Sequence, residues 1–152
     1  MLTGLAKSRV KKVLDQFEET TLVPIVPGEG EKWCVSVAKS IETTHEEIKR
    51  TLEEHQDAYA RILDEDPGLS ARVRELRGKE SESVEQLIAF LGKTQFAEAR
   101  VKQTSENSWE PTTDLEVLRG DILDWITTTR ALHEEIETWY VEAFYRERGE
   151  PG

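Results

Sequence analysis

The residues best suited to chemistry are three histidines, His45, His55 and His133, each of which is predicted to lie on or beside the inward face of a helix. A histidine in a protein interior needs a hydrogen-bond partner or a metal ion, since an unsatisfied polar group there costs about 1–3 kcal/mol. A neighbouring carboxylate is the simpler explanation for any one of them. The candidate carboxylate partners are Glu42, Glu98 and Glu137.

The tetrapeptide His-Glu-Glu-Ile occurs twice, at positions 45–48 and 133–136. The first copy, followed by Leu52, resembles the first metal helix of hemerythrin-like cation-binding domains. The second copy, preceded by Leu132, resembles a later metal helix of the same family. The resemblance covers the chain from its predicted second helix onward and implies a helical bundle that binds metal through histidine and glutamate side chains.

The chain departs from the pattern of that family between the two tetrapeptides. The resemblance implies a histidine with a glutamate four residues later, but Thr94 and Glu98 have this spacing with threonine in place of the histidine. A hemerythrin-like di-iron centre also uses more histidines than the three in this chain. The resemblance therefore implies a mononuclear or depleted site that combines His133 with one of the other two histidines. The candidate metal ligands are His45, His55, Glu98, His133 and Glu137.

Helix geometry limits which histidines can act together. At about 1.5 Å of rise per residue, His45 and His55 lie roughly 15 Å apart on one helix and cannot bind the same ion. If successive helices run in opposite directions, His55 lies level with His133, whereas His45 lies nearer Glu98. The geometry favours His55 and the family resemblance favours His45, so both remain open. Nitrogen and oxygen ligands of this kind suit iron, zinc or manganese.

Two acidic pairs at i, i+3 spacing suggest a different chemistry, because paired carboxylates can hold magnesium for reactions of phosphates. They resemble the acidic motifs of all-α nucleotide pyrophosphohydrolases, although Leu118 stands where that family would have a glutamate. A solvated helix face is the alternative explanation, since such pairs arise readily in an acidic chain. The pairs are Glu82 with Glu85 and Asp121 with Asp124.

Helical periodicity predicts the elements that position these residues. From Cys34 to Ile62, inward residues recur at alternating intervals of four and three, which predicts a long amphipathic helix. Similar patterns predict a first helix that ends near Thr20 and a fourth that begins at Thr113. Residues 20–32 hold two prolines and two glycines among apolar residues, which predicts an extended strap lying on the bundle.

The third helix is predicted in two pieces. A short piece ends at Gly78, the predicted break or kink, and Ser83 resembles the start of a capping box for the main piece. A loop at residues 105–112 then leads to the fourth helix. Together these segments predict an all-α, up-and-down four-helix bundle that forms a single domain over residues 1–152.

The composition limits the expected partners and location. Acidic residues outnumber basic ones by 31 to 20, giving a net charge of −11, and this negative field repels nucleic acid and anionic membrane surfaces. No apolar stretch approaches the roughly 18 residues of a membrane span. The single cysteine, Cys34, excludes an internal disulfide, so a cytoplasmic location is expected. Because Cys34 lies on an apolar stripe, nucleophilic catalysis is not expected.

These observations favour a non-enzymatic helical bundle that acts by binding a protein or a ligand. A homodimer formed through an exposed face of the fourth helix is one form that such binding can take. The first alternative is a hemerythrin-like bundle with a mononuclear or depleted metal site. The second is a magnesium-dependent all-α nucleotide pyrophosphohydrolase.

Overall fold

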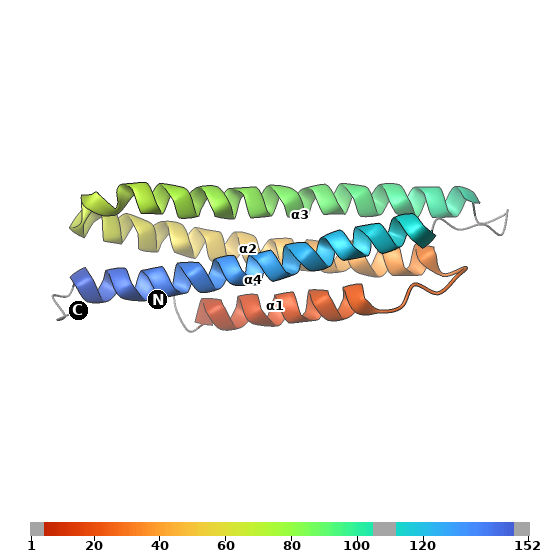
Figure 1. Ribbon diagram of the computed structural model, residues 1–152, viewed down its shortest axis with the longest axis horizontal. Coiled ribbons are helices and arrows are strands. Elements are labelled where there is room, and N and C mark those ends of the chain that lie inside the picture. The colour runs from red at the N-terminus through yellow and green to blue at the C-terminus, as the bar shows by residue number, and fades with distance from the viewer. Residues whose placement is uncertain (1–4, 105–111, 148–152) are drawn as a thin grey trace.

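The structure, a computed structural model, describes residues 5–104 and 112–147 and is built from helices (Figure 1). Over these ranges it contains no β-strand, and none of its helices is both long and apolar enough to cross a membrane. The predicted all-α four-helix bundle is therefore confirmed, whereas the predicted loop lies outside the described residues except for Thr112. The helices are α1 (Leu5–Leu22), α2 (Gly30–Glu65), the short 3₁₀ helix η1 (Pro67–Leu69), α3 (Ser70–Thr104) and α4 (Thr112–Glu147).

The four long helices run in alternating directions, and each packs beside its neighbours in the chain (Figure 1). The first and fourth helices also lie side by side, and α2 contacts α4 across the centre. With 18 residues, α1 is half as long as α2 and α4, which have 36 each. One end of the molecule is therefore a four-helix section, and the other end is a three-helix section made of α2, α3 and α4 (Figure 1).

The interior contains two apolar cores. The first lies in the four-helix section and includes Phe17 and Ile126. The second lies in the three-helix section and includes Tyr59, Leu76 and Ile136. Between the two cores along the helices lies a set of buried polar side chains, which we call the polar layer. Its residues are Thr51, His55, Glu80, Ser83 and Thr129.

The third helix is continuous, so the predicted break at Gly78 and the predicted helix start at Ser83 are both wrong. A glycine inside a helix costs about 1 kcal/mol relative to alanine. Packing outweighs that cost, because Leu76 and Leu87 on either side of the glycine are fully buried. Ser83 is buried as well, and its hydroxyl lies 3.2 Å from that of Thr129 on α4.

The connection between α1 and α2 is shorter than the predicted strap at 20–32. The first helix continues to Leu22 and the second begins at Gly30, so the non-helical segment comprises residues 23–29. Within it Ile25 is buried, whereas Val23 is about half exposed. Gly28 has a φ of 86°, a left-handed conformation that glycine adopts at little cost.

Replacing Gly78 with alanine is expected to raise the free energy of unfolding by about 0.5–1 kcal/mol, because alanine favours the helix. A Cβ at this position would meet no other atom within 4 Å. Gly28→Ala is the matched control and is expected to destabilise the protein, since its φ of 86° disfavours a side chain. Urea unfolding followed by circular dichroism measures both changes. A less stable Gly78→Ala variant would contradict an uninterrupted α3.

Candidate ligand site

A cavity of about 310 Å³ lies between α1, α2 and α4, beside the polar layer. Its walls come from the middle of α1 and from the second halves of α2 and α4. Apolar atoms form most of its surface, and the polar lining residues include two histidines and three carboxylates. The lining residues are Val10, Lys11, Leu14, Asp15, Thr51, His55, Arg130, Ala131, His133, Glu134 and Glu137.

A buried carboxylate, that of Glu80, bonds to the cavity residue His55 and to a second neighbour. Oε2 of Glu80, on α3, lies 2.6 Å from Nδ1 of His55. Oε1 of the same carboxylate accepts a 2.8 Å hydrogen bond from the hydroxyl of Tyr59. All three side chains are almost completely buried. Burial and the negative charge of Glu80 raise the pKa of Tyr59, so its hydroxyl remains a donor.

This arrangement determines which nitrogen of His55 is available to a ligand. A carboxylate offers only acceptor atoms, so Nδ1 of His55 carries the proton that bonds to Glu80. The other ring nitrogen, Nε2, is buried and has no hydrogen-bond partner among the described residues. A buried polar nitrogen without a partner costs about 1–3 kcal/mol, which a ligand that bonds to it would recover.

The second histidine of the cavity, His133 of α4, lies beside His55. Their ring centroids are 5.8 Å apart and their planes are inclined by 45°. Burial, with a smaller electrostatic contribution from the neighbouring His55, lowers the pKa of His133 to about 3. His133 is therefore a neutral imidazole near pH 7, with one nitrogen that can donate a hydrogen bond and one that can accept.

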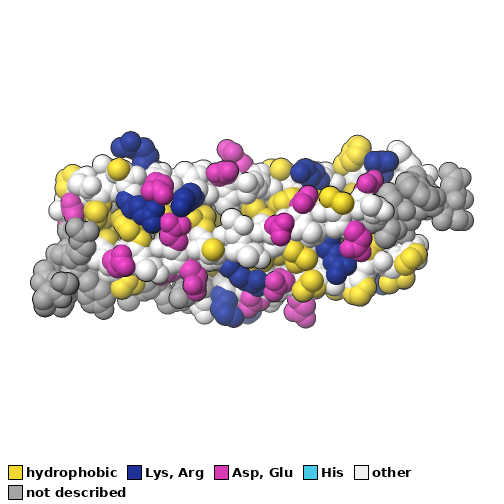
Figure 2. Space-filling view, viewed as in Figure 1, with side chains coloured by type: hydrophobic (Ala, Val, Ile, Leu, Met, Phe, Trp, Pro, Cys, Tyr) yellow, Lys and Arg dark blue, Asp and Glu magenta, His cyan; other side chains and the backbone are white. Residues whose placement is uncertain are grey.

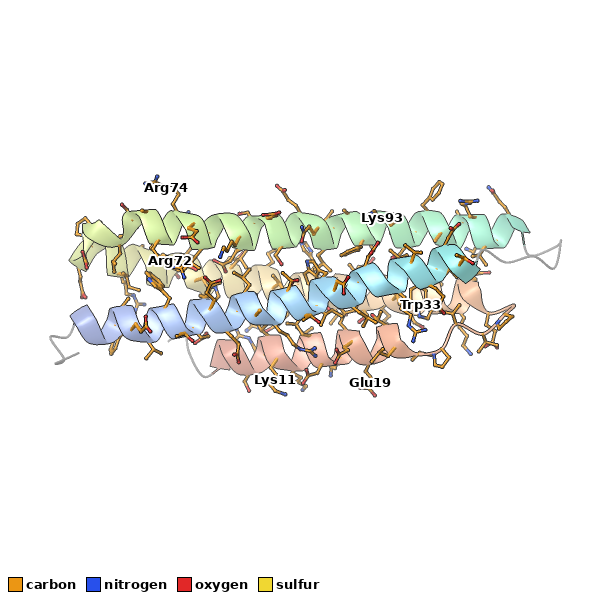
Figure 3. All side chains as sticks on the ribbon, viewed as in Figure 1. Lys11, Glu19, Trp33, Arg72, Arg74 and Lys93 are labelled. Carbon is orange, nitrogen blue, oxygen red and sulfur yellow. The ribbon has the colours of Figure 1, made fainter. Side chains whose placement is uncertain are left out.

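Several charged side chains at the rim of the cavity form ion pairs with one another. Asp15 of α1 binds Lys11 at 2.9 Å and Arg130 of α4 at 2.7 Å, and Arg130 also binds Glu18 at 2.9 Å. Hydrogen bonds from Lys11 and Arg130 lower the pKa of Asp15 below its ordinary value. Lys11 itself projects from α1 toward solvent (Figure 3). The ion pairs connect α1 to α4 along one side of the opening.

The structure brings together some of the predicted site residues. His55, His133 and Glu137 line the same cavity, and the equal height predicted for the two histidines from the helix rise is confirmed. The other two candidates, His45 and Glu98, are partly exposed and do not line it. Over the described ranges, no group of three or more His, Cys, Asp or Glu side chains has the geometry to hold a metal ion. Metal ligation by these residues stays a prediction.

The carboxylate that binds His55 is Glu80, which the sequence analysis missed. The signal was present, because Leu76, Glu80, Ser83 and Leu87 follow one another at intervals of four, three and four. That spacing places them on a single helix face only if the helix continues through Gly78. Because a break was predicted at this glycine, Glu80 was not placed on the same helix face as Leu87. Glu42, Glu98 and Glu137 were considered as histidine partners instead.

The acidic pairs proposed for magnesium are exposed on the surface of α3 and α4. Glu82 lines a shallow groove with Glu135, whereas Asp121 lines a separate groove with Lys93. The two pairs therefore do not face one common groove. Magnesium binding by them is a prediction that the arrangement of the described side chains does not favour.

Comparison with known proteins gives no further assignment. No protein-family model, no curated protein and no solved structure matches this chain. The geometry of the cavity is therefore the basis for a functional proposal.

The low pKa of His133 predicts a loss of stability in acid. In the unfolded chain His133 takes up a proton below its ordinary pKa of 6.5, whereas in the folded protein it does so only near pH 3. Between these values the unfolded state binds more protons, so stability falls with falling pH by at most about 1.4 kcal/mol per unit from this residue.

Urea unfolding at several pH values between 7 and 4 measures this contribution. A His133→Gln variant, which cannot titrate, is expected to lose less stability over this range than the wild type. The control is His45→Gln, a substitution of a histidine outside the cavity, and it should retain the contribution of His133. Parallel curves for the wild type and His133→Gln would show that the assigned pKa is wrong.

Proposed function

We propose that this chain is a non-enzymatic binding protein and that its ligand occupies the cavity between α1, α2 and α4. The observation that carries the proposal is the unpartnered, buried Nε2 of His55 in the wall of a largely apolar cavity. Ligand sites in proteins commonly combine an apolar lining with a few polar groups that fix orientation. The ligand class that fits is a small, mostly apolar molecule with one hydrogen-bonding group.

The size of the cavity supports a ligand of about two fused rings. An apolar cavity of about 150 Å³ is sufficient to bind benzene. The cavity here, at about 310 Å³, has roughly twice that volume. Lys11, Asp15 and Arg130 at its rim are already in ion pairs, so a charged ligand that bonds to them would have to displace these pairs.

The polar wall supports a hydrogen-bonding group at one end of the ligand. Glu80 fixes the ring of His55 through Nδ1, so Nε2 has a defined position before a ligand arrives. Pre-organised groups of this kind improve affinity because less conformational entropy is lost on binding. His133 lies next to it as a neutral second hydrogen-bonding partner.

Two probes of similar shape test the proposal: 2-naphthol, which carries a hydroxyl, and 2-methylnaphthalene, which does not. The wild type is expected to bind 2-naphthol, and His55→Phe should shift its preference toward 2-methylnaphthalene by about threefold to tenfold, the usual value of one neutral hydrogen bond. Ligand fluorescence or calorimetry measures the dissociation constants.

His45→Phe is the matched control, because His45 lies on the same helix but outside the cavity. It should leave both dissociation constants unchanged. Failure of the wild type to bind either probe, or an equal effect of His45→Phe and His55→Phe, would contradict a ligand site at this cavity.

A second candidate function is the binding of a transition-metal ion by His55 and His133. The observation that favours it is the bond between Nδ1 of His55 and Glu80, because metal-binding histidines usually donate their other ring nitrogen to a carboxylate. Glu137, one helical turn after His133, lines the same cavity and would supply a carboxylate. Zinc, iron or manganese would suit this donor set, and the chain would then be a hemerythrin-like bundle with a mononuclear site.

Zinc titration separates this candidate from the first. After treatment with a chelator, the wild type should bind one Zn²⁺, and His55→Gln and His133→Gln should each weaken binding at least tenfold. His45→Gln should bind as the wild type does. Calorimetry measures the affinity, and a saturating metal should raise the melting temperature of the wild type. Equal zinc affinity in all four proteins would exclude the two cavity histidines as ligands.

A further inference from the structure

Two large apolar side chains are strongly exposed at the four-helix end of the molecule. Phe96 of α3 and Val117 of α4 are 66% and 60% exposed, the highest values among the large hydrophobic side chains that the structure describes. Both line one depression between these helices, which we call the α3–α4 groove. It shares no lining residue with the ligand cavity. Exposed apolar groups that cluster in this way mark interaction surfaces.

The two sides of the α3–α4 groove carry opposite charges. The third helix contributes Lys93 and Arg100, and the fourth contributes Asp114 and Asp121, each pair seven residues apart. Arg100 lies 3.8 Å from Asp114 at one end. Because the helices are antiparallel, Lys93 and Asp121 lie level with each other. This second pair is about 10 Å along the helices from the pair of Arg100 and Asp114. Figure 3 shows Lys93 on the viewed face of α3, and Figure 2 shows hydrophobic, basic and acidic side chains together on this part of the surface.

We propose that the α3–α4 groove is the interface of a homodimer whose two-fold axis runs parallel to the helices. This axis places α3 of one protomer over α4 of its partner. Lys93 then faces the partner's Asp121, and Arg100 faces the partner's Asp114. The exposed Phe96 lies over the partner's Val117, so both apolar side chains are removed from water.

Charge complementarity identifies a second copy as the occupant. A two-fold interface between identical chains must be self-complementary. The α3–α4 groove meets this requirement, because one of its sides is basic and the other is acidic. A two-fold axis perpendicular to the helices would instead place α3 over α3 and bring like charges together. The whole chain has a net charge of −11, which opposes association of copies elsewhere on the surface. The groove balances two positive groups, Lys93 and Arg100, with two negative groups, Asp114 and Asp121.

Sedimentation equilibrium tests the interface. The wild type is expected to form a dimer of about twice the 17.4 kDa chain mass. Phe96→Ser should weaken dimerisation about tenfold or more, because a central aromatic side chain contributes strongly to an interface. Ile88→Ser is the matched control, since Ile88 is also an exposed apolar residue of α3 but lies outside the groove. Both side chains are exposed, so neither change should lower the melting temperature of the monomer.

Charge reversal tests whether these four charged groups form the interface. One variant carries Lys93→Glu with Arg100→Glu, and the other carries Asp114→Lys with Asp121→Lys. Each variant alone should be monomeric because its interface charges repel, whereas an equimolar mixture should form the heterodimer, in which all four pairs attract. A monomeric wild type at its highest soluble concentration, a dimer unaffected by Phe96→Ser, or a mixture that does not associate would overturn the proposal.

Discussion

The bond between His55 and Glu80 is the interaction on which the arrangement of this bundle depends. A buried carboxylate is tolerated only when donors satisfy it, and removing one partner of such a pair typically costs about 3–5 kcal/mol. Here the donors are His55 and Tyr59, both on α2, while Glu80 lies on α3. A shift of either helix along the other would separate these atoms. The pair therefore fixes the relative position of α2 and α3. The same bond fixes the orientation of the His55 ring.

The short first helix explains why this polar layer borders a cavity. Over the four-helix section α1 covers α2 and α4 and supplies Leu14 and Phe17 to the core. The part of α1 from Val10 to Asp15 lines the cavity with His55, close to where the interior changes from four helices to three. Ion pairs between Arg130 of α4 and the acidic residues of α1 close the side of the opening. The short length of α1 thus places the cavity beside the polar layer.

Much of the fold was predictable from the sequence, because long amphipathic helices follow from the periodicity of apolar residues. The equal height of His55 and His133 followed from helix rise alone. The prediction was wrong where one residue type was given too much weight, as at Gly78, and that error concealed Glu80. The cavity itself could not be predicted, because its volume depends on where α1 begins and on how three helices pack together. The α3–α4 groove depends on the register of two helices, which periodicity does not determine.

The division of the interior into two apolar cores has a consequence for cooperativity. Proteins open locally in contiguous units, and a unit boundary is expected where apolar contacts are interrupted. The polar layer is such an interruption, since it is crossed by a few hydrogen bonds rather than by continuous apolar packing. Amides near Tyr59 and Leu76 should therefore exchange with solvent hydrogen as one group, separately from those near Phe17 and Ile126. Transient opening of the three-helix section would expose the wall of the cavity, and a ligand would thereby gain wider access to His55 without unfolding of the four-helix section.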